Sequence, residues 1–538
     1  VVETISQKEV YNNIAQEARN AQILMIWTDC DREGEFIGWE ILQAVRLTNT
    51  NINSVNVWRS QFSHLERSHV LNAARNPVRL DLKSVEAVGC RMECDLRVGA
   101  SFTRLLTDLF RRSNVVQLDK NNSLILYGTC QFPTLGFVVD RYMRVKNFVS
   151  ESFWYLFLEI KTKEGASLQL LWKRGHFFDR LYVVLIYQKC MKHKEAVVQK
   201  LTRKPTSNWR PLPLTTVDLQ KDCARIFKMS AKDALDAAEK LYNKGFLSYP
   251  RTETDKFPPT MNLKELIQKQ VQDRQWGGYA EFLHSGGYRT PREGKKDDKA
   301  HPPIHPVNYV NSLSLDNDKQ RKVYEYVVRR FLACCSDDAK GEQTTAVLLW
   351  GEEEFSASGL AVTERNYLDV YPYKKWESSK MLPKFTEGEK VQISCGKVKE
   401  GKTSPPNHMT EPELIALMDV NGIGTDATIA EHIHKIITRG YVVKVKKSGS
   451  EFIIPSELGM GLIEGFNRIE FENISLSKPF LRKKLENSLQ SIVDGNSTKQ
   501  AVLQDVIQLY RQAFVQSALK GSVLLQACKE IIEGNQGR

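Results

Sequence analysis

The chain has no apolar run close to the roughly 20 residues that a membrane-spanning helix needs, so the sequence predicts no such helix. Its ten cysteines form no Cys-x-x-Cys pair, which disfavours a zinc finger and favours reduced, intracellular thiols. No Gly-x-x-x-x-Gly-Lys-Ser/Thr motif occurs, so the usual loop for ATP phosphates is missing. Membrane proteins, disulfide-rich secreted proteins and P-loop enzymes are therefore all disfavoured.

Length and charge point to a multidomain protein with a polyanionic partner. A chain of 538 residues is too long for one hydrophobic core and predicts several domains. Its 76 Lys and Arg outnumber its 64 Asp and Glu, the pI is near 9.0, and such a surplus suits nucleic acid. The chain starts at Val1 with neither a methionine nor a secretory signal, which indicates part of a longer protein.

The most informative segment is Gly245–Asp255, which contains Tyr249, Pro250 and Arg251. A tyrosine hydroxyl is a poor nucleophile unless nearby positive charge stabilises its anion. Arginine keeps its charge and has a fork that fits phosphate. In the short strand that we expect after a helix, Tyr249 and Arg251 share one face. The pair therefore favours attack on a phosphate over a buried tyrosine beside a surface arginine.

A second segment, Asp29-Cys30-Asp31-Arg32-Glu33-Gly34-Glu35, follows a β-prone apolar run at residues 23–27. If it is extended, Asp29, Asp31 and Glu33 share one face at the carboxyl end of a strand, where open α/β sheets bind ligands. Three such carboxylates need a hard cation, so they predict an Mg²⁺ site. An EF-hand calcium loop is the alternative, but a strand instead of a helix precedes Asp29.

Three further motifs occur in order along the chain: Cys130-Gln131-Phe132-Pro133-Thr134-Leu135, Asp298–Pro306 with His301 and His305, and Gly422-Ile423-Gly424-Thr425-Asp426. Together with the acidic and tyrosine segments they resemble the type IA DNA topoisomerases, and eukaryotic topoisomerase III in particular. The resemblance runs from about Asp29 to Tyr441, most of the chain. Five motifs in the family's order are far more specific than any one of them.

The resemblance implies a toroid, a multidomain α and β fold with a partial, Rossmann-like Toprim domain, a β-rich arch, a winged-helix-like (CAP-like) nucleophile domain and a helical base. Alternating β patterns at residues 152–202 and 343–397 agree with an arch that the chain enters twice. We expect these domains: Toprim, C-terminal part, at 1–65; base at 66–150; arch at 151–213; nucleophile domain at 214–340; arch again at 341–404; base with C-terminal helices at 405–538. The family's Toprim domain opens with a strand that carries a Glu and a Lys, and no such strand precedes Asp29. The N-terminal part of this domain is therefore expected to be missing from the chain.

In the family's reaction, the tyrosine joins the 5′ phosphate of single-stranded DNA, another strand passes, and the released 3′ hydroxyl reseals the cut without ATP. This activity relaxes negative supercoils and unlinks recombination intermediates. The resemblance further implies a RecQ-family helicase and an OB-fold protein as partners, and a nuclear location.

Motif by motif, the resemblance assigns roles to individual residues. Tyr249 is the nucleophile, Arg251 stabilises charge on the phosphate, and Asp29 and Asp31 bind Mg²⁺. Glu33 is a third ligand or a proton carrier for the 3′ oxygen. His301 bonds a phosphate or is a structural histidine, and His305 is read as structural.

The remaining candidates are DNA contacts. Arg97 in a predicted helix reaches phosphate or is merely solvated, and Gln131 meets the strand or satisfies a turn. Thr425 and Asp426 contact DNA or cap the next helix. Two other functions stay open, a Toprim metal-dependent nuclease and a non-catalytic DNA-binding scaffold.

Overall fold

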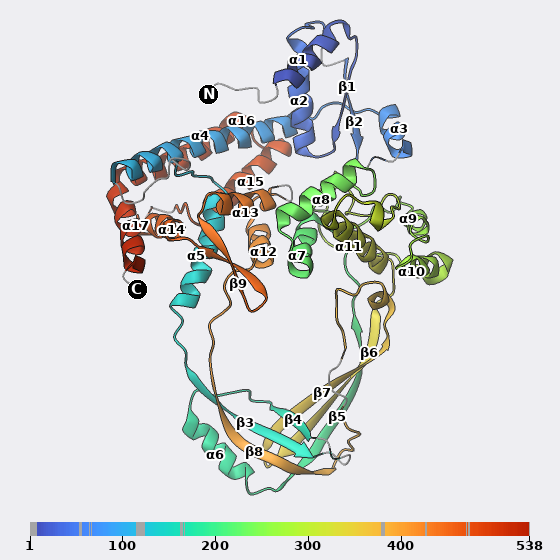
Figure 1. Cartoon of the computed structure of the whole chain (residues 1–538), viewed down its shortest axis with the longest axis vertical. Coiled ribbons are helices and arrows are strands. Elements are labelled where there is room, and N and C mark those ends of the chain that lie inside the picture. The colour runs from blue at the N-terminus through green and yellow to red at the C-terminus, as the bar shows by residue number, and fades with distance from the viewer. Residues whose placement is uncertain are drawn as a thin grey trace.

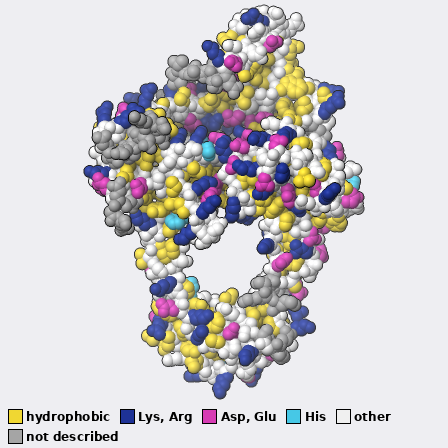
Figure 2. Space-filling view, in the orientation of Figure 1, with side chains coloured by type: hydrophobic (Ala, Val, Ile, Leu, Met, Phe, Trp, Pro, Cys, Tyr) yellow, Lys and Arg dark blue, Asp and Glu magenta, His cyan; other side chains and the backbone are white. Residues whose placement is uncertain are grey.

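The computed structural model describes residues 8–536 except 53–55, 64, 66, 114–123, 162–164, 166, 378–381, 426–427, 470 and 472–473. The chain forms a ring around a hole that stays open in the space-filling view (Figures 1 and 2). The described residues form four separate hydrophobic cores, and the multidomain α and β fold class is confirmed. In the described part of the chain, no helix is long and apolar enough to cross a membrane.

The N-terminal unit is a small α/β layer at the top of Figure 1. Its elements are α1 (Lys8–Glu17), η1 (Ala18–Asn20), β1 (Leu24–Asp29), α2 (Arg32–Arg46), β2 (Val57–Phe62) and α3 (Arg67–Arg75). The two strands are parallel and pair Asp29 with Phe62. Because parallel strands end at the same edge, the acidic segment lies beside the residues that follow β2.

The helical base is built from two distant parts of the chain. The first part contributes α4 (Leu82–Ser113) and α5 (Gln131–Lys146). The second contributes α12 (Glu411–Asn421), α13 (Ile429–Thr438), β9 (Val442–Lys447), β10 (Ser450–Pro455), α14 (Glu457–Arg468), α15 (Phe480–Val493), α16 (Lys499–Leu519) and α17 (Gly521–Gln536). With 32 residues, α4 is about 48 Å long and runs from the N-terminal unit to the far side of the base. Both parts share one core, in which Phe102 stacks on Tyr127 and Tyr127 packs against Phe132.

The arch opposite the base is a closed six-stranded barrel with the order β3-β4-β7-β6-β5-β8. Its elements are β3 (Ser152–Lys161), β4 (Ser167–Trp172), α6 (Arg180–Cys190), β5 (Glu195–Asn208), β6 (Ala339–Trp350), β7 (Glu353–Glu364), η5 (Asn366–Asp369) and β8 (Lys390–Lys402). Alternation along β4 buries Leu168, Leu170 and Trp172 inside the barrel and leaves the residues between them exposed. Since β3 to β5 and β6 to β8 come from separate stretches, the barrel joins two passages of the chain.

A helical unit lies between the two passages through the arch, to the right of the base in Figure 1. Its elements are α7 (Thr216–Phe227), α8 (Ala231–Asn243), α9 (Leu263–Lys269), α10 (Gly277–Phe282), η3 (Leu283–Gly287), η4 (Ser312–Ser314) and α11 (Asp318–Cys334). The helix expected before Tyr249 is α8, and Ser230 caps it by accepting from the Asp233 N–H. The segment after α8 leads to Tyr249 and to the N-terminal unit.

Candidate active site

The candidate active site lies where the N-terminal unit meets the helical unit that carries Tyr249. The Tyr249 N–H donates to the Ser63 carbonyl at 3.0 Å, directly after β2. From α8, the Tyr242 hydroxyl donates to Asp29 Oδ1 at 3.0 Å. The carboxyl ends of β1 and β2 therefore form one site with the segment that follows α8.

The acidic segment is a strand-to-helix turn, so the prediction of one extended face was wrong for Glu33. Asp29 ends β1, whereas Asp31 caps α2 and accepts from the Gly34 N–H at 2.7 Å. A Cβ at Gly34 would lie 1.9 Å from the Asp29 carbonyl oxygen, so glycine lets the helix begin this close to the strand. Glu33 is already helical, and its carboxylate binds Arg91 of α4 at 2.7 Å.

Asp29 and Asp31 remain neighbours, and this pair fits a divalent cation. Burial raises the pKa of the Asp29 carboxyl, the hydrogen bond from Tyr242 lowers it, and the nearby Asp31 carboxylate raises it again. Among the described residues, no group of three His, Cys, Asp or Glu side chains is arranged to hold a metal ion. Mg²⁺ commonly binds through one or two carboxylates and keeps several waters, so two aspartates are a sufficient protein contribution.

A buried ion pair that the sequence reasoning missed fixes the end of β1. Arg59 of β2 is fully buried and binds Glu35 at 2.9 Å. The same guanidinium donates to the Thr28 carbonyl at 2.6 Å and to the Asp29 carbonyl. Glu35 is the last acid of the acidic segment. Its structural role follows from its ion pair with Arg59, and the sequence does not reveal that pair because Arg59 lies in another strand.

Tyr249 is 8% exposed and lies between the acidic segment and a histidine. Its hydroxyl is 3.5 Å from Asp31 Oδ2, the outer limit of a hydrogen bond. Its ring centroid is 4.6 Å from that of His301 and 5.2 Å from that of Tyr242. The structure therefore brings together Tyr249, Asp29, Asp31 and His301.

Arg251 has a different setting from the one predicted. No strand runs through residues 249–251, since the nearest extended pairing is an isolated bridge between Leu247 and Pro306. The Arg251 guanidinium bonds Glu239 of α8 through Nε at 2.9 Å and Nη2 at 2.5 Å. About a third of the side chain is exposed, so a phosphate could compete with Glu239 for the guanidinium.

The two histidines of the Asp298–Pro306 motif differ in the contacts of their ring nitrogens. His301 is 4% exposed, and within the described residues neither ring nitrogen has a hydrogen-bond partner. Burial lowers the pKa of His301 although Asp31, Asp298 and Asp29 oppose the shift. His305 is fully buried with Nδ1 at 2.6 Å from the Pro303 carbonyl, and burial lowers its pKa to about 4.

A cleft of about 680 Å³ opens beside this cluster. Its lining comes from both units, with Ser63 and His69 on one side and Lys256, Lys299 and His301 on the other. Glu293 and Asp297 also line the cleft, and Lys256 pairs with Asp297 at 3.0 Å, so the two lysines are balanced by carboxylates. A phosphodiester in this cleft would be within reach of groups from both units.

Two of the predicted motifs, the one with Gln131 and the Gly-Ile-Gly loop, lie together in the base and not beside Tyr249. Gln131 is the first residue of α5, is buried, and its amide nitrogen lies 2.8 Å from Nδ1 of His432 in α13. A Cβ at Gly424 would approach the His432 ring to 3.0 Å, so the Gly-Ile-Gly loop packs on the same histidine. Burial lowers the pKa of His432 to about 3. The sequence reasoning did not identify this histidine.

The other DNA candidates have local partners. The N-cap of α13 is Thr428, so the prediction that Thr425 caps this helix was wrong. The Thr425 N–H donates to Thr428 Oγ1 at 3.0 Å. Asp426 lies outside the described residues. Arg97 of α4 pairs with Glu93 one turn away at 2.6 Å. None of these contacts joins Tyr249.

Comparison with protein families gives two matches. Residues 79–504 match the family described as DNA topoisomerase, and residues 2–62 match the Toprim domain.

Individual proteins agree with these matches. DNA topoisomerase 3 of Candidozyma auris is 56% identical over 517 residues, 96% of this chain and 80% of that protein. DNA topoisomerase 3 of Saccharomyces cerevisiae is 50% identical, with 97% and 84% covered. Human DNA topoisomerase 3-alpha is 42% identical, with 96% and 50% covered. Among solved structures, full-length topoisomerase I from Thermotoga maritima has the same fold, with a TM-score of 0.73 at 24% identity over 96% of this chain and 82% of that one.

Proposed function

This chain belongs to the type IA DNA topoisomerases, and from that membership we propose that Tyr249 is the nucleophile with which it cuts single-stranded DNA. The observation that carries the proposal is the position of the Tyr249 hydroxyl, 3.5 Å from Asp31 at the junction of two units. A tyrosine from one unit that meets carboxylates from another forms a reactive centre that can separate when the units part.

The proposed reaction exchanges one phosphoester bond for another. The Tyr249 oxygen forms a bond to phosphorus while the bond from phosphorus to the 3′ oxygen breaks, which leaves a 5′-phosphotyrosine and a 3′ hydroxyl. Asp31, whose Oδ2 lies 3.5 Å from the Tyr249 hydroxyl, takes the phenol proton, and Glu33, once released from Arg91 and when it is not a metal ligand, passes a proton from water to the 3′ oxygen. Because the new ester conserves the bond energy, resealing needs no nucleotide.

Arg251 and His301 are proposed to hold the phosphate. Arg251 exchanges Glu239 for a phosphate oxygen and stabilises charge on the pentacoordinate phosphorus. A buried ring nitrogen of His301 that lacks a protein partner donates to a second oxygen. Gln131 and Thr425 are proposed to contact the bound strand within the base, together with Asp426 and Arg97.

Asp29 and Asp31 are the proposed holders of Mg²⁺, with Glu33 as a further ligand once it leaves Arg91. The bound cation would neutralise the two carboxylates and help to orient the 3′ hydroxyl for resealing. The support is the pair of neighbouring, half-buried carboxylates, since the Asp31 charge raises the pKa of Asp29 in the absence of positive charge.

A passing strand is proposed to enter the ring while the cut is held open, so that the protein relaxes negative supercoils and unlinks recombination intermediates. Figure 2 shows Lys and Arg side chains mixed with acidic ones across the face above the hole, and the chain carries a surplus of 12 basic residues. This charge supports contact with a polyanion.

A nuclear location, a RecQ-family helicase and an OB-fold protein are proposed on the similarity to eukaryotic DNA topoisomerase 3. Co-purification of the tagged protein from nuclei tests all three. Recovery without a helicase and an OB-fold protein would contradict the partners.

Covalent capture tests the nucleophile. Wild-type protein mixed with labelled single-stranded DNA and quenched with denaturant should retain the label, and Tyr249→Phe should lose capture at least about 1000-fold while binding DNA normally, because it lacks the attacking oxygen. Tyr142→Phe, on α5 of the base, is the matched control and should capture DNA like the wild type. DNA cleavage that persists in Tyr249→Phe without an adduct would instead support the metal-dependent nuclease.

A further inference from the structure

A buried carboxylate, that of Glu411, joins the base to the helical unit that carries Tyr249. Glu411 is the first residue of α12 and is 8% exposed. One of its oxygens accepts from the Ala231 N–H of α8 at 2.7 Å, and the other accepts from Lys444 Nζ of β9 at 2.8 Å. We refer to Glu411 with these two donors as the Glu411 clasp.

The clasp puts a negative charge at the start of two helices that belong to different units. Ala231 is the first residue of α8, so its N–H has no acceptor inside the helix. Glu411 stands at the first position of α12, where the helix dipole also favours a carboxylate. A charged acceptor binds an N–H more strongly than a neutral one does, so the ionised form of Glu411 holds the start of α8.

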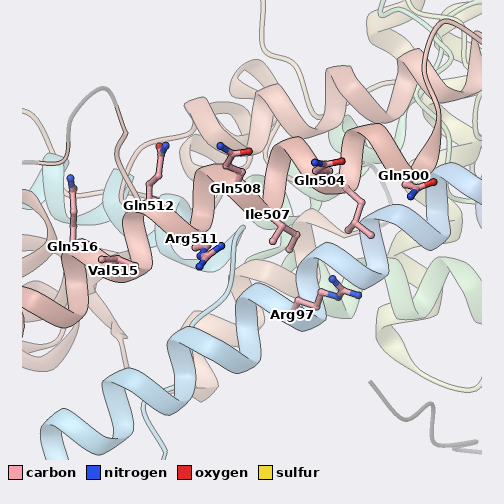
Figure 3. Close-up of a pocket in the computed structure, with 10 residues that line it drawn as sticks. Arg97, Gln500, Gln504, Ile507, Gln508, Arg511, Gln512, Val515 and Gln516 are labelled. Carbon is pink, nitrogen blue, oxygen red and sulfur yellow. The ribbon is translucent and has the colours of Figure 1, made fainter.

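The base half of the clasp is positioned by contacts within the base alone. Thr410 and Glu413 form a capping box that fixes the first turn of α12. Lys444 holds Glu411 and also pairs with Glu451 of β10 at 3.0 Å. The core of the base includes residues of α4 and α16, and these two long helices lie side by side (Figure 3). Glu411 therefore keeps its orientation and a cationic partner when α8 moves away.

The other contacts between these two units are small apolar side chains and more exposed ion pairs. Val217 and Ala231 are the described residues of the helical unit that belong to the core of the base. Lys232 pairs with Glu431 of α13 at 2.9 Å, and a third or more of each side chain is exposed. Exposed ion pairs contribute little to stability. Among the described residues, the clasp is therefore the most buried polar contact between the helical unit and the base.

The helix that the clasp holds leads to the catalytic centre. Its first residue meets Glu411, and further along α8 Glu239 holds Arg251 and Tyr242 holds Asp29. We propose that Glu411 is a positioning residue of the closed ring, which holds α8 so that Tyr249 meets the acidic segment and releases α8 when the units part. The proposal rests on the proposed function and adds the group that sets the balance between closed and parted units.

The place of Lys444 makes the clasp reversible. A buried ion pair that loses one charged partner leaves an uncompensated charge, which is costly. Parting of the units removes only the neutral Ala231 N–H, which water can replace, whereas Lys444 stays with Glu411 on the base. The clasp thus favours the closed state without preventing separation.

Fluorescence energy transfer measures the balance between closed and parted units without any DNA. Eight of the ten cysteines are buried, so Cys30 and Cys395 are replaced by serine, and dyes are attached through Gln268→Cys on α9 and Asn487→Cys on α15. Glu411→Gln, made in this labelled protein, keeps the side-chain size and an acceptor but loses the charge. Molecules with low transfer, in which the units are parted, should become about tenfold more frequent relative to those with high transfer.

Two further variants separate the clasp from a general loss of stability. Glu353→Gln is the matched control, because Glu353 is a carboxylate 6% exposed whose partners Trp172 and Arg174 belong to the arch, as it does. It should leave the transfer distribution as in the wild type. Glu431→Gln breaks the more exposed pair with Lys232 and should increase the parted molecules by less than Glu411→Gln does. An unchanged distribution in Glu411→Gln, or an equal change in Glu353→Gln, overturns the proposal.

Covalent capture of a short single-stranded oligonucleotide separates this proposal from the proposed function. Capture by Glu411→Gln should fall only in proportion to the loss of high-transfer molecules, because the chemistry in the closed state is intact. A greater loss of capture overturns the proposal, since it places Glu411 in the chemistry itself. Absence of capture in the wild type overturns the proposed function, and the transfer distribution, which needs no cutting, still decides the clasp.

Discussion

At the residue scale, the two neighbouring carboxylates Asp29 and Asp31 are the proposed holders of the cation. Asp29 accepts a hydrogen bond from the Tyr242 hydroxyl, and Asp31 accepts one from the Gly34 N–H. These donors leave oxygen lone pairs on both side chains, since an ionised carboxylate accepts about four hydrogen bonds. A cation at this pair would therefore bind without breaking the local structure.

Replacing both aspartates tests the metal. Asp29→Asn with Asp31→Asn should raise the Mg²⁺ concentration for half-maximal relaxation at least about tenfold, because each loses an anionic ligand. Binding of single-stranded DNA should persist, since no phosphate contact is removed. Asp140→Asn with Asp236→Asn, both outside the site, is the control. A wild-type Mg²⁺ requirement in the double variant would contradict the proposal.

The positions of individual residues show which parts of the site the sequence could predict. Tyr249, Asp29, Asp31 and His301 form one cluster, as their residue types and motifs suggested. Glu33 and Arg251 did not take the predicted orientation, because their partners Arg91 and Glu239 lie elsewhere in the chain. An ion pair over such a separation depends on tertiary packing, which local spacing does not reveal.

At the scale of elements, α8 connects the two halves of the site. Glu239 and Tyr242 are three residues apart and therefore lie on one face of the helix, where one holds Arg251 and the other Asp29. The start of α8 is fixed from the base, since Glu411 accepts from the Ala231 N–H at 2.7 Å. The sequence predicted this helix and its cap, but not the part of the site that it holds.

The segment packed behind Tyr249 contains a pH-sensitive element. Ser248 and His305 exchange hydrogen bonds, with the Ser248 N–H donating to the His305 carbonyl and the His305 N–H to Ser248 Oγ. The buried His305 ring has a pKa of about 4, below the ordinary 6.5. The unfolded chain therefore binds a proton as the pH falls below 6.5, and the folded chain does so only near 4. This histidine's contribution to stability is complete above pH 6.5 and is lost as the pH falls towards 4.

Chemical denaturation at two pH values tests this element. Between pH 7 and pH 5, His305 should remove about 2 kcal/mol from the free energy of unfolding, or 1.36 kcal/mol for each pH unit below 6.5. His305→Gln should be less stable at pH 7 but should lose less between the two values. His176→Gln, at an exposed position of the arch, serves as the control. An equal pH loss in His305→Gln and wild type would refute the assignment.

At the scale of the whole molecule, the N-terminal unit and α8, which hold the proposed site, lie above the hole and the arch lies below it (Figure 1). The chain crosses between the upper units and the arch four times, from α5 to β3, β5 to α7, α11 to β6 and β8 to α12 (Figure 1). The contact between Tyr249 and Ser63 lies in the upper part, so parting the units there would open the ring while the arch holds it together. Ion pairs such as Lys232 with Glu431 and Lys296 with Asp419 also join the upper units.

The same scale shows why the fold was only partly predictable. Alternating residues at positions such as Leu168 and Leu170 indicated strands, and the resemblance supplied the toroid. The closure of six strands into a barrel depends on pairings such as Phe157 with Lys397, far apart in the chain, which periodicity cannot specify.

Supercoil preference tests the mechanism of the entire ring. A buried tyrosine that attacks one phosphate needs an unpaired strand, and underwound DNA opens locally far more easily than overwound DNA. We therefore expect relaxation of negatively supercoiled plasmid at least about tenfold faster than that of an otherwise identical positively supercoiled plasmid, which corresponds to a barrier difference of about 1.4 kcal/mol. A positively supercoiled plasmid with a preformed single-stranded bulge should regain the rate, because the bulge supplies the strand that overwinding withholds. Tyr249→Phe should relax none of the three. Equal rates on the two closed plasmids would contradict a single-strand mechanism and indicate an enzyme that cuts duplex DNA.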